Sequence, residues 1–322
     1  MYPDAISGID GITFPNGYLV VVGSWDKTCK SFFIQQTGQQ QPVSQIQSDS
    51  PITCVKKSFD CNFVFGTAAG SVEMWDVQNN KRVTVAKHND AVTSVRYIPE
   101  LKSIISSSLD NTMLLIDINS GNRQTMNIND KVIAMDCKGP VLAYATPKKV
   151  NVFDFRSSRD ISNDVLGQQQ TPSSVVQSIA VFPDLQGITY GGCDGRATVV
   201  NFKDKKSDFT YTFKAQHKKQ GTAGTFYYPV NSVSFFDADS MLTAGSDGVI
   251  NIWDKKKKSL INTLNTPQQN YPITTADFIC DGRLLAYSVG YDWHKGAQGI
   301  SEFASNSPVI KVVDKPLVKS ND

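Results

Sequence analysis

The feature of this sequence that most restricts its possible folds is a short motif that recurs along the chain. Segments of alternating apolar residues, typical of β-strands, end repeatedly in an aromatic or aliphatic residue followed by an acidic one. The clear copies and then the degenerate ones are Trp75-Asp76, Ile116-Asp117, Phe153-Asp154, Trp253-Asp254, Phe32-Phe33, Val200-Asn201 and Val312-Val313. Successive copies are 43, 41, 37, 47, 53 and 59 residues apart, and the first two gaps match a repeat of about 40–45 residues. The chain therefore contains seven similar units, with loop insertions in the last ones.

Each unit has the pattern of a small antiparallel sheet. In the third unit, alternation predicts strands over 92–98, 103–109 and 112–118, with a tight turn at Asp110-Asn111. One such sheet alone would leave both of its faces in water, so the units must pack side by side in a closed ring. The sequence thus predicts an all-β, seven-bladed β-propeller of the WD-repeat type, in which residues 1–322 form a single domain.

The sequence allows two ways of closing the ring. The first inner strand, over about 7–14, begins almost at once, which leaves no earlier strand to complete the last blade. Either the residues after Asp314, within Lys315–Lys319, supply the missing strand, or the seventh blade has three strands.

The composition argues against several classes of function. A net charge of +2 gives no overall reason to expect nucleic-acid binding, and no apolar run approaches the roughly 20 residues that cross a bilayer. The six cysteines are scattered and there are only three histidines, so we expect no metal site, no cofactor and reduced thiols in a cytosolic or nuclear protein.

One group of residues imitates a hydrolase triad. His88 precedes an inner strand, Ser108 lies on the next strand and Asp110 sits in the turn after it. A His–Ser–Asp chain at these places ties a loop to a strand through buried hydrogen bonds, so we expect a structural role and no enzyme. An enzyme would lose activity in Ser108→Ala, whereas a structural role predicts a loss of about 1–3 kcal/mol of stability. We assign structural roles also to Trp75, Asp76, Trp253 and Asp254.

The repeat register sorts charged residues between the two faces of the ring. Turns between the second and third strands share one face, here called the first face, with the connections between blades. The residues expected to bind a partner there are Trp25, Arg196, Lys214, His217, Lys218, Lys219, Asp292, Trp293 and Lys295. A positive surface interleaved with aromatic residues suits an acidic peptide, or equally single-stranded nucleic acid. The run Lys255–Lys258 falls on the opposite face, where we expect an ordinary solvated turn.

Several segments resemble the propeller family shared by the nuclear-pore mRNA export factor and the mitotic checkpoint propeller, both of which bind GLEBS segments. They are GSWDKT (23–28), HNDAV (88–92), CDGRATV (193–199), FKAQHKK (213–219), YPVNSVSF (228–235), GSDGVINIWD (245–254) and SVGYDWHKG (288–296). The insertion YDWHKG and the segment TGQQQPVSQIQ (37–47) resemble the export branch, whereas FDFRS (153–157) is closer to the checkpoint branch. The FK–x–H segment is read as carrying one extra residue.

This resemblance implies a scaffold in the nucleus, at the nuclear pore and also in the cytoplasm, that supports mRNA export. Its partner would be the GLEBS segment of an FG nucleoporin, whose glutamates would pair with Arg196 and the basic segment 214–219, with Trp25 a weaker contact. Trp293 and Lys295 would serve a nearby site for RNA or a second protein. The alternatives are a spindle-checkpoint protein that binds checkpoint kinases at kinetochores and a direct single-stranded RNA-binding propeller.

Overall fold

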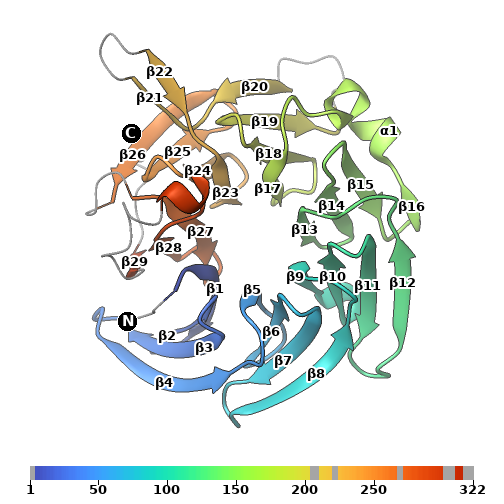
Figure 1. Ribbon diagram of the computed structural model, residues 1–322, viewed down its shortest axis with the longest axis vertical. Helices are drawn as coiled ribbons and strands as arrows, with labels where there is room; N and C mark the ends of the chain where they lie inside the picture. Colours follow the sequence, from blue (N-terminus) through green and yellow to red (C-terminus); the bar gives the residue numbers. More distant parts are fainter. Residues whose placement is uncertain (1–3, 204–209, 220–223, 267–270, 300–308, 315–322) are drawn as a thin grey trace.

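The computed structural model describes residues 4–203, 210–219, 224–266, 271–299 and 309–314. Seven sheets stand around a central axis, and in each sheet strands that are neighbours in sequence are neighbours in space (Figure 1). The predicted all-β, seven-bladed propeller is confirmed.

The strands of each blade follow one another along the chain. Blade 1 contains β1 (Ile6–Phe14), β2 (Gly17–Ser24), β3 (Thr28–Gln35) and β4 (Gln40–Gln47). Blade 2 contains β5 (Ile52–Lys57), β6 (Asn62–Thr67), β7 (Ser71–Asp76) and β8 (Lys81–Lys87). Blade 3 contains β9 (Val92–Ile98), the 3-10 turn η1 (Pro99–Leu101), β10 (Ser103–Ser108), β11 (Thr112–Asp117) and β12 (Arg123–Asn127). Blades 4 and 5 contain β13 (Ala134–Lys138), β14 (Val141–Ala145), β15 (Val150–Asp154), β16 (Arg159–Asp160); and β17 (Val176–Val181), β18 (Gly187–Gly192), β19 (Arg196–Asn201), β20 (Tyr211–Lys214). Blades 6 and 7 contain β23 (Val230–Phe235), β24 (Ser240–Gly245), β25 (Val249–Asp254), β26 (Ser259–Asn265); and β27 (Ile273–Ile279), β28 (Leu284–Val289), β29 (Val309–Asp314).

Three further elements lie outside this pattern. The hairpin β21 (His217–Lys219) and β22 (Thr225–Tyr227) forms its own two-stranded sheet between blades 5 and 6. A short helix α1 (Ser162–Val165) and the turn η2 (Gly167–Gln170) follow the two-residue strand β16 in blade 4, and η4 (Gly296–Gly299) ends the insertion of blade 7.

The hydrophobic core lies between the blades, as strand alternation requires. Leu19 and Val21 of blade 1 pack against Phe63, Phe65 and Trp75 of blade 2, and all five side chains are buried. Similar clusters join the later blades, so the face of each sheet is covered by the next sheet in the ring. Closure therefore stabilises every blade through its neighbours.

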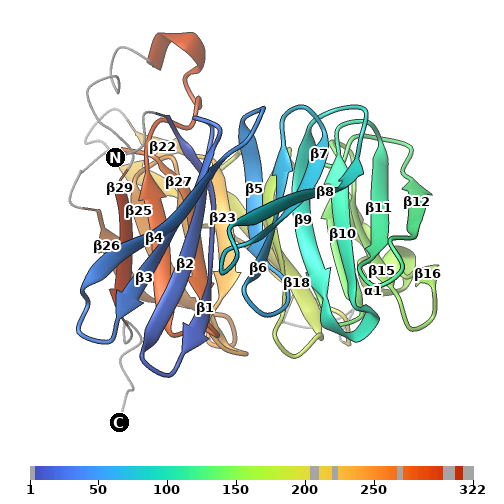
Figure 2. The same cartoon turned by 90° about the horizontal axis from the view of Figure 1, so that it is seen from below.

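The first face is set by turns that contact the connections between blades. Ser48, just after β4, donates its backbone N–H to the carbonyl of Lys27 in the β2–β3 turn at 2.8 Å. Ile128 makes the same 2.8 Å contact with Asn111 in blade 3, and Ala215 with Gly195 in blade 5. The first face is the upper one in Figure 2, where the segment that ends in η4 rises above the blades.

The ring closes between blades 7 and 1 with three strands in blade 7 among the described residues. Lys315–Lys319, named above as candidates for a fourth strand, lie outside these residues. Two ion pairs reach from blade 2 past blade 1 to blade 7. Lys56 pairs with Asp277 in the central channel, and Lys57 Nζ lies 3.0 Å from Asp281 Oδ1. These contacts supplement the packing of β1 on β27 at the seam.

Candidate docking face

The residues predicted to bind a partner fall into two groups on the first face. Arg196, Lys214 and the β21–β22 hairpin form a basic group at blade 5. Trp25 and Trp293 come together at the first-face mouth of the central channel, where both line one pocket. The strands between them keep the two groups on separate blades (Figure 1).

The basic group is built on paired strand ends. Arg196 begins β19 and is the direct cross-strand partner of Lys214 at the end of β20. The Arg196 side chain is half exposed, and its Nε lies 3.9 Å from Asp194 Oδ2, which is longer than a hydrogen bond. Lys214 Nζ lies 5.3 Å from the ring centroid of Tyr227, a cation–π distance.

The hairpin adds aromatic surface to these charges. His217 pairs with Tyr227 across the two strands, and their rings stack with centroids 6.3 Å apart. Phe226 and Tyr227 are 44% and 41% exposed, although large apolar side chains usually seek burial. Sequence reasoning did not single out these two aromatic residues, and their only signal was the run Phe226–Tyr228 after a basic segment.

Lys218 and Lys219 differ in their surroundings. Lys219 is exposed on the hairpin, whereas Lys218 is half-buried and its charge acts on the buried carboxyl of Asp247. Lys214 is therefore a better candidate than Lys218 for contact with a partner.

In the segment FKAQHKK the structure places Gln216, and not His217, at the buried position of the blade. Gln216 is fully buried and occupies in blade 6 the place that His88 occupies in blade 3, because both donate their backbone N–H to the glycine of the preceding turn. Its side-chain amide donates to Thr243 Oγ1 at 3.3 Å and accepts from Asn251 at 3.1 Å. The segment has no extra residue in this register; glutamine replaces histidine, and His217 is free to join the exposed hairpin.

The predicted His–Ser–Asp chain is present with a different serine. His88 Nδ1 lies 3.2 Å from Asp110 Oδ2, but Nε2 lies 2.9 Å from Ser106 Oγ, two residues before the predicted Ser108. Alternation places Ser106 and Ser108 on the same side of β10. The His88 ring bonds to Ser106, which lies farther from the turn at Asp110, and not to Ser108. Ser108 instead donates to the carbonyl of Asp90 at 3.0 Å, so it ties the loop to the strand independently.

We expect Ser106→Ala to lower the free energy of unfolding by about 1–3 kcal/mol, because His88 Nε2 would lose its buried partner. Ser108→Ala should cost a similar amount through the carbonyl of Asp90. Urea denaturation checks both, with Thr125→Ala on the exposed strand β12 as control, which should change stability by less than about 0.5 kcal/mol. If both serine variants unfold like the wild type, these hydroxyls are not structural.

The remaining motif residues hold their own blades together. Trp75 is fully buried and donates to Asn80 at 3.1 Å, while Trp253 donates to Thr243 at 2.9 Å and packs against Phe213. The following acids close the next turns: Asp76 accepts from Asn79, whose hydrogen bonds lower the pKa of Asp76, and Asp254 accepts from the Lys257 N–H at 2.7 Å.

The three predicted residues of the insertion after β28 differ in their exposure and contacts. Trp293 is 59% exposed and has a φ of +62°, an unusual conformation for a tryptophan. Lys295 is exposed and donates its backbone N–H to the Tyr291 hydroxyl at 3.2 Å. The Asp292 side chain is only 9% exposed and contacts Asn231, Ser246 and His294, which anchors the insertion; its contact with a partner stays a prediction.

The described part of the chain offers no group of three or more His, Cys, Asp or Glu residues able to hold a metal ion. The six cysteines are free thiols, and burial raises the pKa of Cys280 to about 12, which suppresses the reactive thiolate. No helix in the described ranges is long and apolar enough to span a membrane.

Comparisons with known proteins agree with this architecture. The model of the family "WD domain, G-beta repeat" matches residues 80–117 and 220–254. The chain is 27% identical to the Poly(A)+ RNA export protein of Schizosaccharomyces pombe, over 88% of this chain and 80% of that protein. It is 28% identical to Protein Rae1 of Drosophila melanogaster, over 86% and 82%. The solved structure described as "Structure of U3-55K" superimposes with a TM-score of 0.74 at 15% identity over 89% of both chains, which shows the fold alone. The chain is a WD-repeat propeller related to mRNA export factors.

Proposed function

We propose that this relative of mRNA export factors is a non-enzymatic adaptor in the nucleus that supports mRNA export. It docks an acidic, GLEBS-like segment of an FG nucleoporin at the pore through the basic group of blade 5. The observation that carries the proposal is the convergence of Arg196, Lys214, His217 and Tyr227 on one exposed site in a relative of an RNA export protein.

The chemistry of this group suits carboxylates. Arg196 presents a planar fork of N–H donors that can bind a carboxylate through two parallel hydrogen bonds. Its 3.9 Å separation from Asp194 leaves no hydrogen bond to break before a partner carboxylate binds. Tyr227, between Lys214 and His217, supplies the flat apolar contact that interface anchors commonly use.

The test is nucleoporin capture by a charge-reversed variant. We expect Arg196→Glu combined with Lys214→Glu to weaken retention of an FG nucleoporin from nuclear extract about tenfold, because two attractive contacts become repulsive. The matched control is Lys256→Glu with Lys257→Glu, which changes the net charge equally on exposed residues of the opposite face and should leave retention unchanged.

Three outcomes count against the proposal. Equal retention by both variants would remove the basic group from the docking site. Selective capture of checkpoint kinases, with kinetochore localisation, would select the checkpoint function. Binding of single-stranded RNA that falls steeply with salt, without nucleoporin binding, would select the RNA-binding function.

A further inference from the structure

A second site lies at the first-face mouth of the central channel, away from the basic group. This mouth pocket has a volume of about 580 Å³, and its rim carries the aromatic side chains of Trp25, Tyr291 and Trp293. Trp25 and Trp293 are 45% and 59% exposed, so their rings remain accessible. Two exposed tryptophans from opposite ends of the chain at one concave site mark a place of recognition.

The aromatic rim is held in place before any ligand binds. The Tyr291 hydroxyl donates to the carbonyl of Gly296 at 2.6 Å, and its ring lies 5.8 Å from that of Trp293. A Cβ atom at Gly299 would lie 2.0 Å from the Tyr291 hydroxyl, so only glycine allows this packing. Asp292 fastens the insertion to blade 6 through Asn231, whose Nδ2 lies 2.6 Å from Asp292 Oδ2. A preformed rim reduces the ordering cost of binding.

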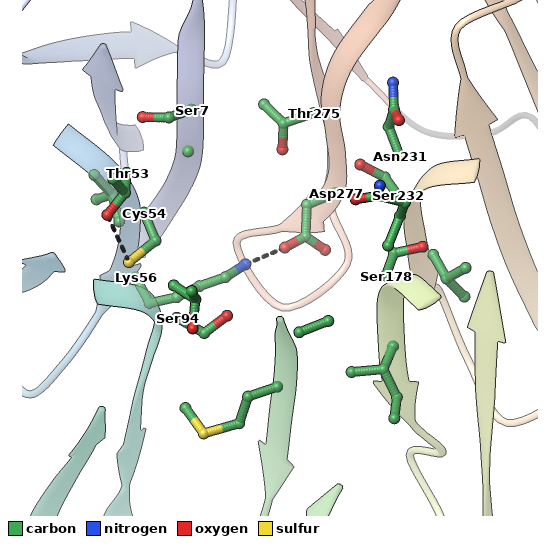
Figure 3. A pocket seen from close by; sticks show the side chains of 18 of the residues that line it. Ser7, Thr53, Cys54, Lys56, Ser94, Ser178, Asn231, Ser232, Thr275 and Asp277 are labelled. Carbon is green, nitrogen blue, oxygen red and sulfur yellow. Dashed lines mark hydrogen bonds and ion pairs between the residues drawn. The ribbon is translucent and has the colours of Figure 1, made fainter. Parts of the chain in front are cut away.

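Three polar side chains that line the pocket, Ser7, Thr53 and Asn231, use their donor hydrogens within the protein and so present their oxygens as acceptors. Ser7 donates its hydroxyl to the carbonyl of Ile52 at 2.5 Å, and Thr53 donates to Val92 at 2.6 Å. The Asn231 amide nitrogen donates to the carbonyl of Ile273 at 2.9 Å and to Asp292. The Asn231 side-chain oxygen is therefore the atom that can accept a hydrogen bond from a ligand. Ser7, Thr53 and Asn231 also line the channel chamber below the mouth (Figure 3).

The charged side chains among the described lining residues of the pocket are acidic. They are Asp4 and Asp292, and none of these lining residues is lysine or arginine. Asp292 also contacts His294 Nδ1 at 2.6 Å. The faces of the three aromatic rings add negative potential, which attracts cations at about 6 Å or less from a ring centroid. An anionic phosphate or carboxylate would meet no lysine or arginine among the described lining residues, unlike at the basic group of blade 5.

We infer that the mouth pocket binds an arginine side chain presented by a partner peptide. The guanidinium stacks on the exposed tryptophans and donates its five N–H groups to the acceptor oxygens of Ser7, Thr53 and Asn231, a combination that no neutral or anionic side chain offers. Lysine fits less well because its ammonium is strongly hydrated and does not stack. This site is independent of the basic group, so the inference goes beyond the proposed function and can fail or hold separately from it.

The test uses fluorescein-labelled peptides that differ at one position. In anisotropy titrations, a Gly-Ser-Arg-Ser-Gly peptide should bind about tenfold more tightly than the same peptide with citrulline, which keeps the shape of arginine and loses its charge. The lysine peptide should fall between them. Trp293→Ala and Trp25→Ala should each weaken the arginine peptide at least about threefold, which is within the range of a cation–π contact.

Matched controls separate this site from the rest of the face. Phe226→Ala removes an exposed aromatic residue of the hairpin and should leave arginine-peptide binding unchanged, as should Lys256→Glu with Lys257→Glu on the opposite face. Equal binding of arginine and citrulline peptides, or tryptophan variants that bind like the wild type, would overturn the inference. Loss of oligouridine binding in Trp293→Ala, with no binding of the arginine peptide, would overturn it in favour of a nucleobase pocket.

Discussion

Replacing Asp136 with alanine should lower the free energy of unfolding by about 3 kcal/mol, because it leaves the charge of Arg96 unpaired in the channel. Arg96 Nε lies 2.7 Å from Asp136 Oδ1, and Asp136 Oδ2 accepts the Val181 N–H at 2.8 Å. These bonds join blades 3, 4 and 5. Burial alone would raise the pKa of the Asp136 carboxyl, but attraction to Arg96 and Lys56 together with the hydrogen bonds from Val181 and Arg96 outweighs burial and lowers the pKa. The stabilisation is therefore present near neutral pH and is lost as the pH falls through this lowered pKa.

A double replacement distinguishes the lost partner from the lost packing. Arg96→Met with Asp136→Leu removes both charges and keeps apolar volume, so we expect it to recover most of the stability lost in Asp136→Ala. Lys57→Ala, which breaks the more exposed pair with Asp281, should cost less than about 1 kcal/mol. Guanidinium denaturation of the four proteins measures these differences. A small effect of Asp136→Ala would mean that water in the channel solvates Arg96 adequately.

The second large effect concerns two equivalent aspartates, Asp110 and Asp247, whose pKa values are shifted in opposite directions. Asp110 and Asp247 occupy the same turn position in blades 3 and 6, and each accepts the N–H of the residue two positions later. Asp110 also accepts from Thr112 Oγ1 at 2.6 Å and contacts His88, whereas blade 6 has Val249 and Gln216 at these places. Burial tends to raise the pKa of Asp110, but its hydrogen bonds outweigh burial and lower it. Asp247 lacks these partners, and burial raises its pKa to about 6.

We therefore expect Asp110→Asn to destabilise the protein by about 1–2 kcal/mol and Asp247→Asn to stabilise it by about 2 kcal/mol at pH 8. The folded pKa of Asp247 is higher than that of the unfolded chain, so the folded state holds a proton between about pH 4 and 6 that the unfolded state releases. The destabilisation caused by the buried Asp247 carboxylate thus declines as the pH falls. The gain in the free energy of unfolding from Asp247→Asn should therefore shrink to about half at pH 5. Urea denaturation at both pH values checks this, and a destabilised Asp247→Asn would contradict it.

The blade architecture could be predicted because its signal is local and repeated. The strands around Ser103–Ser108 and the Asp110 turn follow from alternation and turn chemistry, and the structure confirms them. The serine partner of His88 could not be predicted in this way, because Ser106 and Ser108 lie on the same face of one strand. Only the position of the His88 side chain in the fold decides between the two serines.

The sequence names the candidate docking residues one by one, but it does not divide them into two groups. Repeat register places Trp25 and Trp293 on one face, yet their meeting at one pocket depends on how the insertion folds. Asp292 resembles an exposed carboxylate in the sequence, and only its contacts with Asn231 and Ser246 reveal an anchor. Gln216 was missed for a related reason, since the histidine beside it fits the expected motif better than the buried glutamine does.

The contiguity of each blade in the chain has a consequence for how this molecule can diverge. The hairpin β21–β22 and the segment that ends in η4 lie between strands of the blades, and the neighbouring sheets keep the same strand order as the other blades. Lengthening such a loop costs little conformational entropy, about 0.6 kcal/mol for each doubling. Specificity can therefore be exchanged by replacing one surface segment at a time, while the charges and hydroxyls that line the channel keep the ring in a single geometry.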